Sequence, residues 1–176
     1  MARTTYPRSE LRALRVAWTV AASVWPLTAF LAALTLAALA WWAGTGDWGL
    51  VLLSLLFAKA GLLGLVASFA LHEAAHAAVL KRLNGITSVT VERTALRVSL
   101  RPEGMITRGQ NALVALAGPV SCGLVGAALW FAGDALAWWY LLHLAFLLPV
   151  FGDGRSLWRS VHFKTGRAPA AGSRRR

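Results

Sequence analysis

Long apolar runs separated by short polar segments constrain the fold of this chain more than any other feature. The runs cover residues 16–42, 48–80, 112–131 and 136–151. A helix that crosses the hydrocarbon core of a bilayer needs about 20 predominantly apolar residues. Because each run approaches or exceeds that length, we expect an all-α polytopic membrane protein with about four transmembrane helices.

The first two runs are longer than a single span requires. Residues 16–42 exceed the apolar region of about 7–15 residues in a secretory signal, so we expect them to be retained as the first helix. Residues 48–80 are too long for one upright span and too short for two. We therefore predict a second helix that is strongly tilted, or broken near Gly61 and Gly64.

The segment between the second and third helices has a different pattern. Residues 86–91 are rich in β-branched side chains, and residues 96–101 alternate between apolar and polar side chains. Alternation with a period of two is typical of a half-buried strand. With residues 92–94 as the turn, the pattern predicts a small β-hairpin between the second and third helices.

Basic residues are concentrated in the polar segments. The chain has 18 Lys and Arg against 7 Asp and Glu, and every Lys and Arg except Lys59 lies within residues 1–15, 81–108 or 153–176. Positive residues accumulate on the cytoplasmic side of membrane proteins. We therefore expect a multi-pass protein of the plasma or inner membrane with both termini in the cytosol. The lipid bilayer explains the net charge of +11, and no nucleic-acid partner is expected.

The same distribution indicates how the chain is divided. We expect a basic cytosolic segment over residues 1–15, one membrane-embedded domain over residues 16–160, and a basic, disordered tail over residues 161–176. A chain of this length favours a single domain. Cys122 is the only cysteine, which excludes an intrachain disulfide.

The second apolar run contains an ionisable cluster, His72-Glu73-Ala74-Ala75-His76. Ionisable groups at membrane depth cost roughly 2.5–3.5 kcal/mol each, and they are functional by default. On a helix, positions i and i+4 share one face, so both imidazoles can reach one metal ion, and the glutamate can hold the attacking water. The alternative is a polar contact that packs two helices together, but a metal ion is the better partner for these groups.

Asp153 is the preferred candidate for a third metal ligand. A catalytic zinc site with two histidines needs a third protein ligand and an open position for water. With four alternating spans, Asp153 lies at the depth of the histidine pair, whereas Asp47 and Asp134 lie on the opposite side. The alternative for Asp153 is a helix C-cap paired with Arg155. His143 lies about two to three turns deeper, where we expect a buried, hydrogen-bonded histidine, with a ligand role as the alternative.

Three motifs, in this order, resemble those of the site-2 proteases, a family of intramembrane zinc metalloproteases. They are HExxH at residues 72–76, Ala-Gly-Pro at residues 117–119 and Pro-Val-Phe-Gly-Asp-Gly at residues 149–154. The resemblance covers residues 57–160. It implies a minimal, membrane-embedded metalloprotease-like domain that cleaves a membrane-anchored protein or peptide near the cytosolic face.

The resemblance also implies roles for individual residues. By analogy with the family, His72, His76 and Asp153 bind Zn²⁺, and Glu73 is the general base. Two positions depart from the pattern, because Cys122 and Phe146 stand where the family often has asparagine. These departures favour an alternative, a non-catalytic relative that binds a partner. A metal or proton carrier is a third hypothesis, and the absence of an internal repeat makes it the weakest.

Overall fold

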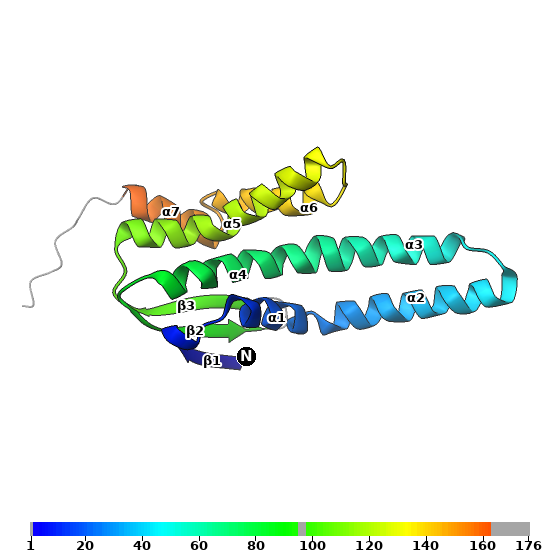
Figure 1. The fold of residues 1–176 in the computed structure, drawn as a ribbon, viewed down its shortest axis with the longest axis horizontal. Coiled ribbons are helices and arrows are strands. Elements are labelled where there is room, and N and C mark those ends of the chain that lie inside the picture. The colour runs from blue at the N-terminus through cyan, green and yellow to red at the C-terminus, as the bar shows by residue number, and fades with distance from the viewer. Residues whose placement is uncertain (1, 95–97, 163–176) are drawn as a thin grey trace, which may run out of the picture.

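The computed structural model describes residues 2–94 and 98–162 (Figure 1). Most of them are helical, and three strands form one small antiparallel sheet in the order β1-β2-β3. The helices are η1 (Arg8–Glu10), α1 (Ala13–Ser23), α2 (Trp25–Thr45), α3 (Gly49–Ala58), η2 (Lys59–Val66), α4 (Ala67–Arg82), α5 (Arg108–Phe131), α6 (Ala137–Leu141), η3 (Leu142–Leu147) and α7 (Gly152–His162). The strands are β1 (Ala2–Pro7), β2 (Ile86–Arg93) and β3 (Val98–Gly104).

Three helices in the described part of the chain are long and apolar enough to cross a membrane. They are α2, the continuous helix that runs from α3 through η2 to α4, and α5. The expectation of a mostly helical chain with helices of spanning length is confirmed, whereas a fourth span is not. In Figure 1, α2 and α3 lie side by side as a hairpin that extends beyond the other helices.

The expected fourth span, residues 136–151, is not one helix. α6 ends at Leu141, and the 3₁₀-helix η3 continues only to Leu147. Leu148 is extended, with φ −68° and ψ 143°, because the ring of Pro149 disfavours helical backbone in the residue before it. Helical structure resumes in α7, an element that the sequence did not predict. α7 includes residues 161 and 162 of the expected tail, and the rest of that tail lies outside the described residues.

The first apolar run, predicted as one helix over residues 16–42, is divided in two. α1 ends at Ser23, and α2 begins at Trp25 after Val24, which has φ −100° and ψ 24°. Pro26 lies in the first turn of α2, where its missing N–H costs no intrahelical hydrogen bond. Of the two helices formed by this run, only α2 is long enough to span a membrane. The shorter helix α1 packs against α4.

The second apolar run forms one unbroken helix of 34 residues, with the π-helical segment η2 in its middle. At 1.5 Å per residue it is about 51 Å long, well over the hydrocarbon thickness of about 30 Å. The predicted break points, Gly61 and Gly64, both lie in η2. A Cβ at Gly61 would come within 2.8 Å of Leu31, and one at Gly64 within 2.6 Å of Trp139. These glycines therefore allow close packing against α2 and α6, and they do not break the helix.

The predicted β-hairpin is confirmed as β2 and β3, with Val91 opposite Leu100. The predicted turn at residues 92–94 is wrong in part, because Glu92 and Arg93 continue β2 and pair with Ser99 and Val98. Two residues predicted to lie in its second strand, 96 and 97, fall outside the described residues. The N-terminal segment, expected only as a basic segment, contributes a third strand. β1 pairs antiparallel with β2, and Tyr6 lies opposite Val89.

A buried carboxylate links the three strands. Glu92 of the central strand β2 is 5% exposed. Its Oε1 lies 3.0 Å from Nε of Arg3 in β1, and its Oε2 lies 2.9 Å from Nε of Arg101 in β3. Because a buried charge is tolerated only when it is paired, the guanidinium groups of both outer strands stabilise this central position.

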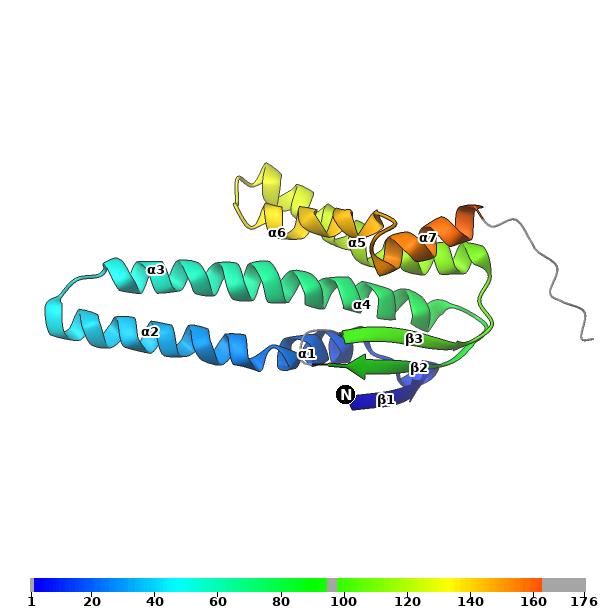
Figure 2. The same cartoon turned by 180° about the vertical axis from the view of Figure 1, so that it is seen from behind.

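The buried core lies where α1, α4 and the sheet meet. Its members are Leu11, Val16, Ala77, Leu80, Leu83, Ile86 and Val89. On its other side α4 packs against α5, and α7 packs against α5 in turn (Figure 2). The helix α4, which carries the HExxH sequence near its middle, therefore packs against other elements on both sides.

Candidate metal centre

Two histidines of α4 face the interior of the molecule. His72 and His76 are 3% and 7% exposed, although α4 is otherwise an apolar helix in this region. Their four-residue spacing places them on one face of the helix. The Nε2 atoms of the two rings lie 3.1 Å apart, so both rings point at the same place.

Asp153 reaches the same place from the first turn of α7. Its Oδ2 lies 3.0 Å from Nε2 of His72 and 3.5 Å from Nε2 of His76. The turn at Pro149 interrupts the helix between η3 and α7, and Gly154 makes that turn possible because a Cβ there would collide with the carbonyl of Leu148. The alternative of a C-cap paired with Arg155 is wrong, because Asp153 lies at the helix start and Arg155 donates to the Phe151 carbonyl.

The three converging atoms form an electron-rich site. The ligand atoms of His72, His76 and Asp153 all lie within 4.8 Å of one another. Burial acts to raise the pKa of the Asp153 carboxyl, but hydrogen bonds with the two histidines outweigh it, and the pKa lies below its usual value. Two ring nitrogens and a carboxylate oxygen this close together require a proton or a metal cation between them, since their lone pairs repel. Two histidines and a carboxylate are also a ligand set found in catalytic zinc sites.

Gly118 allows α5 to approach the histidines. A Cβ at this position would lie 2.6 Å from Nε2 of His76 and 2.7 Å from Nε2 of His72. No side chain other than hydrogen fits there without displacing the rings. The Gly-Pro motif therefore has a direct steric role at the candidate metal centre.

A backbone carbonyl of α5 orients the second histidine. Nδ1 of His76 lies 2.7 Å from the carbonyl oxygen of Val114, which can only accept a hydrogen bond. Nδ1 must therefore carry the hydrogen, and in the neutral ring Nε2 presents its lone pair to His72 and Asp153. Hydrogen bonds of this kind are typical of histidines that bind metals.

Glu73 lines a cavity together with the three converging residues. The cavity has a volume of about 760 Å³, within the usual range of ligand sites. Its walls come from α1, α4, β3, α5 and the segment from η3 to α7, and most of them are apolar. The cavity therefore offers a mainly apolar space beside the Glu73 carboxylate and the candidate metal ligands.

His143 and the two departures from the family pattern surround the His72 ring. His143 is 3% exposed and hydrogen-bonded to His72 and Ser68, as expected of a buried histidine. The ring of Phe146 packs edge-on against His72 at 5.3 Å, and Cys122 is buried and donates to the carbonyl of Ser68. Ser68 was not predicted from the sequence, although its position four residues before His72 places it on the same face of α4.

The two aspartates expected on the opposite side have other roles. Asp47 accepts a hydrogen bond from the backbone N–H of Gly49 at the start of α3. Asp134 forms an ion pair of 3.1 Å with Lys59 of η2. Neither belongs to the group formed by His72, His76 and Asp153.

Comparisons of the chain with protein-family models, with curated proteins and with solved structures gave no match. The resemblance to the site-2 proteases therefore depends on the sequence motifs alone. The convergence of the His72, His76 and Asp153 side chains is independent of the motifs, because the distances between these side chains come from the fold of this chain.

Proposed function

We propose that this protein is an intramembrane zinc endopeptidase that hydrolyses a peptide bond of a membrane-anchored protein or peptide near the cytosolic face. The observation that carries the proposal is the convergence of His72, His76 and Asp153 within 4.8 Å, beside Glu73, in a cavity among helices of membrane-spanning length. Buried ionisable groups in such surroundings are costly, and a bound cation neutralises this cluster.

The chemistry divides between the metal and the protein. Zinc at this centre would supply Lewis-acid chemistry, polarising the scissile carbonyl and lowering the pKa of bound water. Glu73 takes the proton of the attacking water and then delivers it to the leaving amine as a general acid. His72, His76 and Asp153 would hold the ion, beside a cavity with mainly apolar walls.

The cavity is lined by a strand that can bind an extended substrate. A transmembrane helix satisfies its peptide groups internally, so it must unwind before a peptide bond can be attacked. β3 is an edge strand of the sheet, and Val98, Ser99 and Leu100 line the cavity. An unwound segment can pair with such an edge. The alternative is that the hairpin serves only as an amphipathic surface element.

The decisive test compares Glu73→Gln with the wild-type protein, reconstituted in liposomes with a candidate membrane-anchored substrate. We expect cleavage to be abolished while the zinc content stays near that of the wild type, because the amide cannot accept the proton. Asp153→Ala is the matched variant, which should lose both zinc and cleavage. Unchanged turnover by Glu73→Gln would contradict the proposal.

A non-catalytic protein that binds a membrane partner is the second candidate. Cys122 and Phe146 favour it, because a buried thiol and an aromatic ring stand where the family often has a polar amide. This candidate predicts that Glu73→Gln keeps both its fold and its full biological effect. A complementation assay in cells that lack the wild-type protein separates the two candidates.

A further inference from the structure

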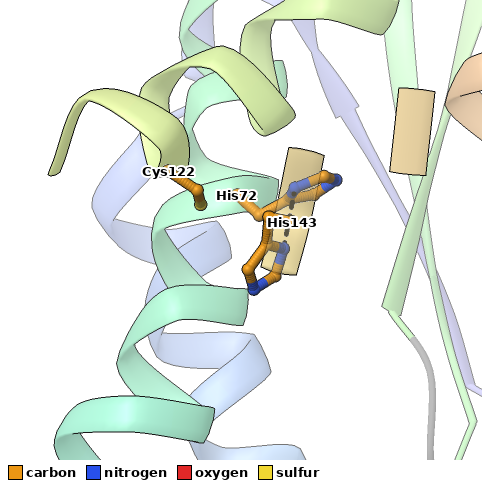
Figure 3. Close-up of side chains that lie close together, drawn as sticks. All are labelled: His72, Cys122 and His143. Atoms are coloured by element: carbon orange, nitrogen blue, oxygen red, sulfur yellow. Dashed lines mark hydrogen bonds between the residues drawn. The ribbon is translucent and has the colours of Figure 1, made fainter. Parts of the chain in front are cut away.

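A chain of hydrogen bonds leads away from the His72 ring, starting at the ring nitrogen that does not face Asp153. Nδ1 of His72 lies 3.2 Å from Nδ1 of His143, and Nε2 of His143 lies 3.0 Å from Oγ of Ser68. The Ser68 hydroxyl donates to the carbonyl of Leu65 at 3.0 Å. Figure 3 shows the dashed contact between the two rings, with Cys122 approaching from α5.

The last acceptor in this series of hydrogen bonds determines which atom donates at each step. The Leu65 carbonyl can only accept, so the single hydroxyl hydrogen of Ser68 points toward it. The Ser68 oxygen then accepts from His143, whose hydrogen lies on Nε2 and whose Nδ1 is a free acceptor. His72 donates from Nδ1 to that acceptor, which leaves the lone pair of its Nε2 directed at Asp153.

We propose that His143 and Ser68 are positioning residues, which hold His72 in the tautomer that presents Nε2 to the metal. The inference rests on the proposed function, since it concerns the same metal centre. Partners of this kind fix the tautomer and the ring orientation of histidine ligands, and they raise metal affinity. His76 needs no such side chain, because the Val114 carbonyl performs the same task.

The same side chains do not form a second metal site. Ligand atoms of His72, Cys122 and His143 lie within 4.8 Å of one another, and all three residues are buried. However, the Cys122 thiol donates to the carbonyl of Ser68, and both ring nitrogens of His143 already have partners. A metal bound by Cys122 and Nδ1 of His143 would break the thiol's hydrogen bond and the contact between the two rings, so the cluster supports His72 instead of binding an ion of its own.

The test measures zinc affinity by competition with a chelator, in full-length protein in detergent. We expect His143→Leu, which removes the acceptor for His72, to bind zinc roughly 10–100-fold more weakly than the wild type. His143→Asn, whose amide oxygen can replace Nδ1 as the acceptor, should retain most of the affinity. Phe146→Leu is the packing control, because its ring touches both histidines without a hydrogen bond in the described structure.

A second measurement does not depend on any variant. In ¹⁵N-histidine NMR spectra of the zinc-loaded wild type, His72 should carry its hydrogen on Nδ1 and His143 on Nε2. The opposite tautomers would overturn the proposal, as would wild-type zinc affinity in His143→Leu. A second zinc ion per chain that is lost in Cys122→Ser would also overturn it. A wild type that binds zinc but cleaves nothing would contradict only the proposed protease, because the affinity ratios and tautomers still decide the roles of His143 and Ser68.

Discussion

At the scale of single residues, the absence of a side chain is as important as the ligands themselves. Gly118 lies where α5 crosses the histidine pair, and a Cβ there would approach both rings to less than 3 Å. Gly109, in the first turn of the same helix, has open space around it. The two glycines therefore make a matched pair for testing the steric role of Gly118.

We expect Gly118→Ala to weaken zinc binding and to lower the free energy of unfolding by about 1–3 kcal/mol, the usual cost of overpacking. Gly109→Ala should leave both quantities near their wild-type values, since alanine favours the helix and meets no neighbour. Thermal unfolding in detergent and chelator competition measure the two effects. Equal behaviour of the two variants would show that α5 does not lie against the histidines.

At the scale of elements, the N-terminal residues before α2 pack into the core of the protein. Leu11, between η1 and α1, is 1% exposed and packs in the core with Ala77 and Leu80 of α4. Leu14, one turn later on α1, is 85% exposed. α1 and η1 therefore pack against α4 on the side opposite α5, close to the candidate metal ligands (Figure 1).

Truncation of the buried leucine tests this packing. Leu11→Ala should lower the free energy of unfolding by about 2–5 kcal/mol, because it leaves a cavity in the core. Leu14→Ala is the control, and we expect a much smaller effect because its side chain contacts little of the protein. The measurement is a thermal melt of each variant in the same detergent. Comparable losses for both variants would contradict the packing of this region.

At the scale of the whole molecule, the polar segments are divided between the two ends of the long axis, and the candidate metal centre lies in the half that contains the sheet and α7 (Figure 1). The sheet and α7 lie toward one end, and the turn between α2 and α3 forms the other end (Figure 1). The basic residues described within 2–15, 81–94, 98–108 and 153–162 belong to elements of the first end, which we predict to face the cytosol on the positive-inside rule. Asp47 lies in the turn between α2 and α3, and Met105, which is 88% exposed, lies between β3 and α5.

Single cysteines introduced into a Cys122→Ser background test this orientation. In intact cells, a membrane-impermeant maleimide should label Asp47→Cys and not Met105→Cys, and inverted vesicles should give the reverse. The buried native thiol is removed so that only the introduced cysteine reports. Labelling of both positions from the same side would contradict the predicted orientation.

Much of the architecture follows from local patterns in the sequence. Apolar runs of spanning length indicate helices, and a period of two in residues 96–101 indicates a strand, because each pattern reflects the geometry of its own element. The HExxH spacing likewise places two imidazoles on one helical face. β1 was not predicted, because its pairing with β2 depends on a partner more than 80 residues away, and its polar side chains carry no apolar alternation.

By itself the sequence determined the helical, apolar character of the chain, the hairpin and the pairing of His72 with His76, since each depends on residues close together in the chain. The sequence also indicated Asp153 as the third ligand, but through a fourth span that the structure does not contain. Only the tertiary structure decided that Asp153 reaches this pair from α7, that Ser68 and His143 contact His72 and each other, and that the last apolar run is interrupted at Pro149. The physical reason is that contacts between α4, α5, η3 and α7 join segments far apart in sequence. The distances between their side chains depend on helix packing and on the turn before α7. The periodicity of residues within one segment cannot predict these distances.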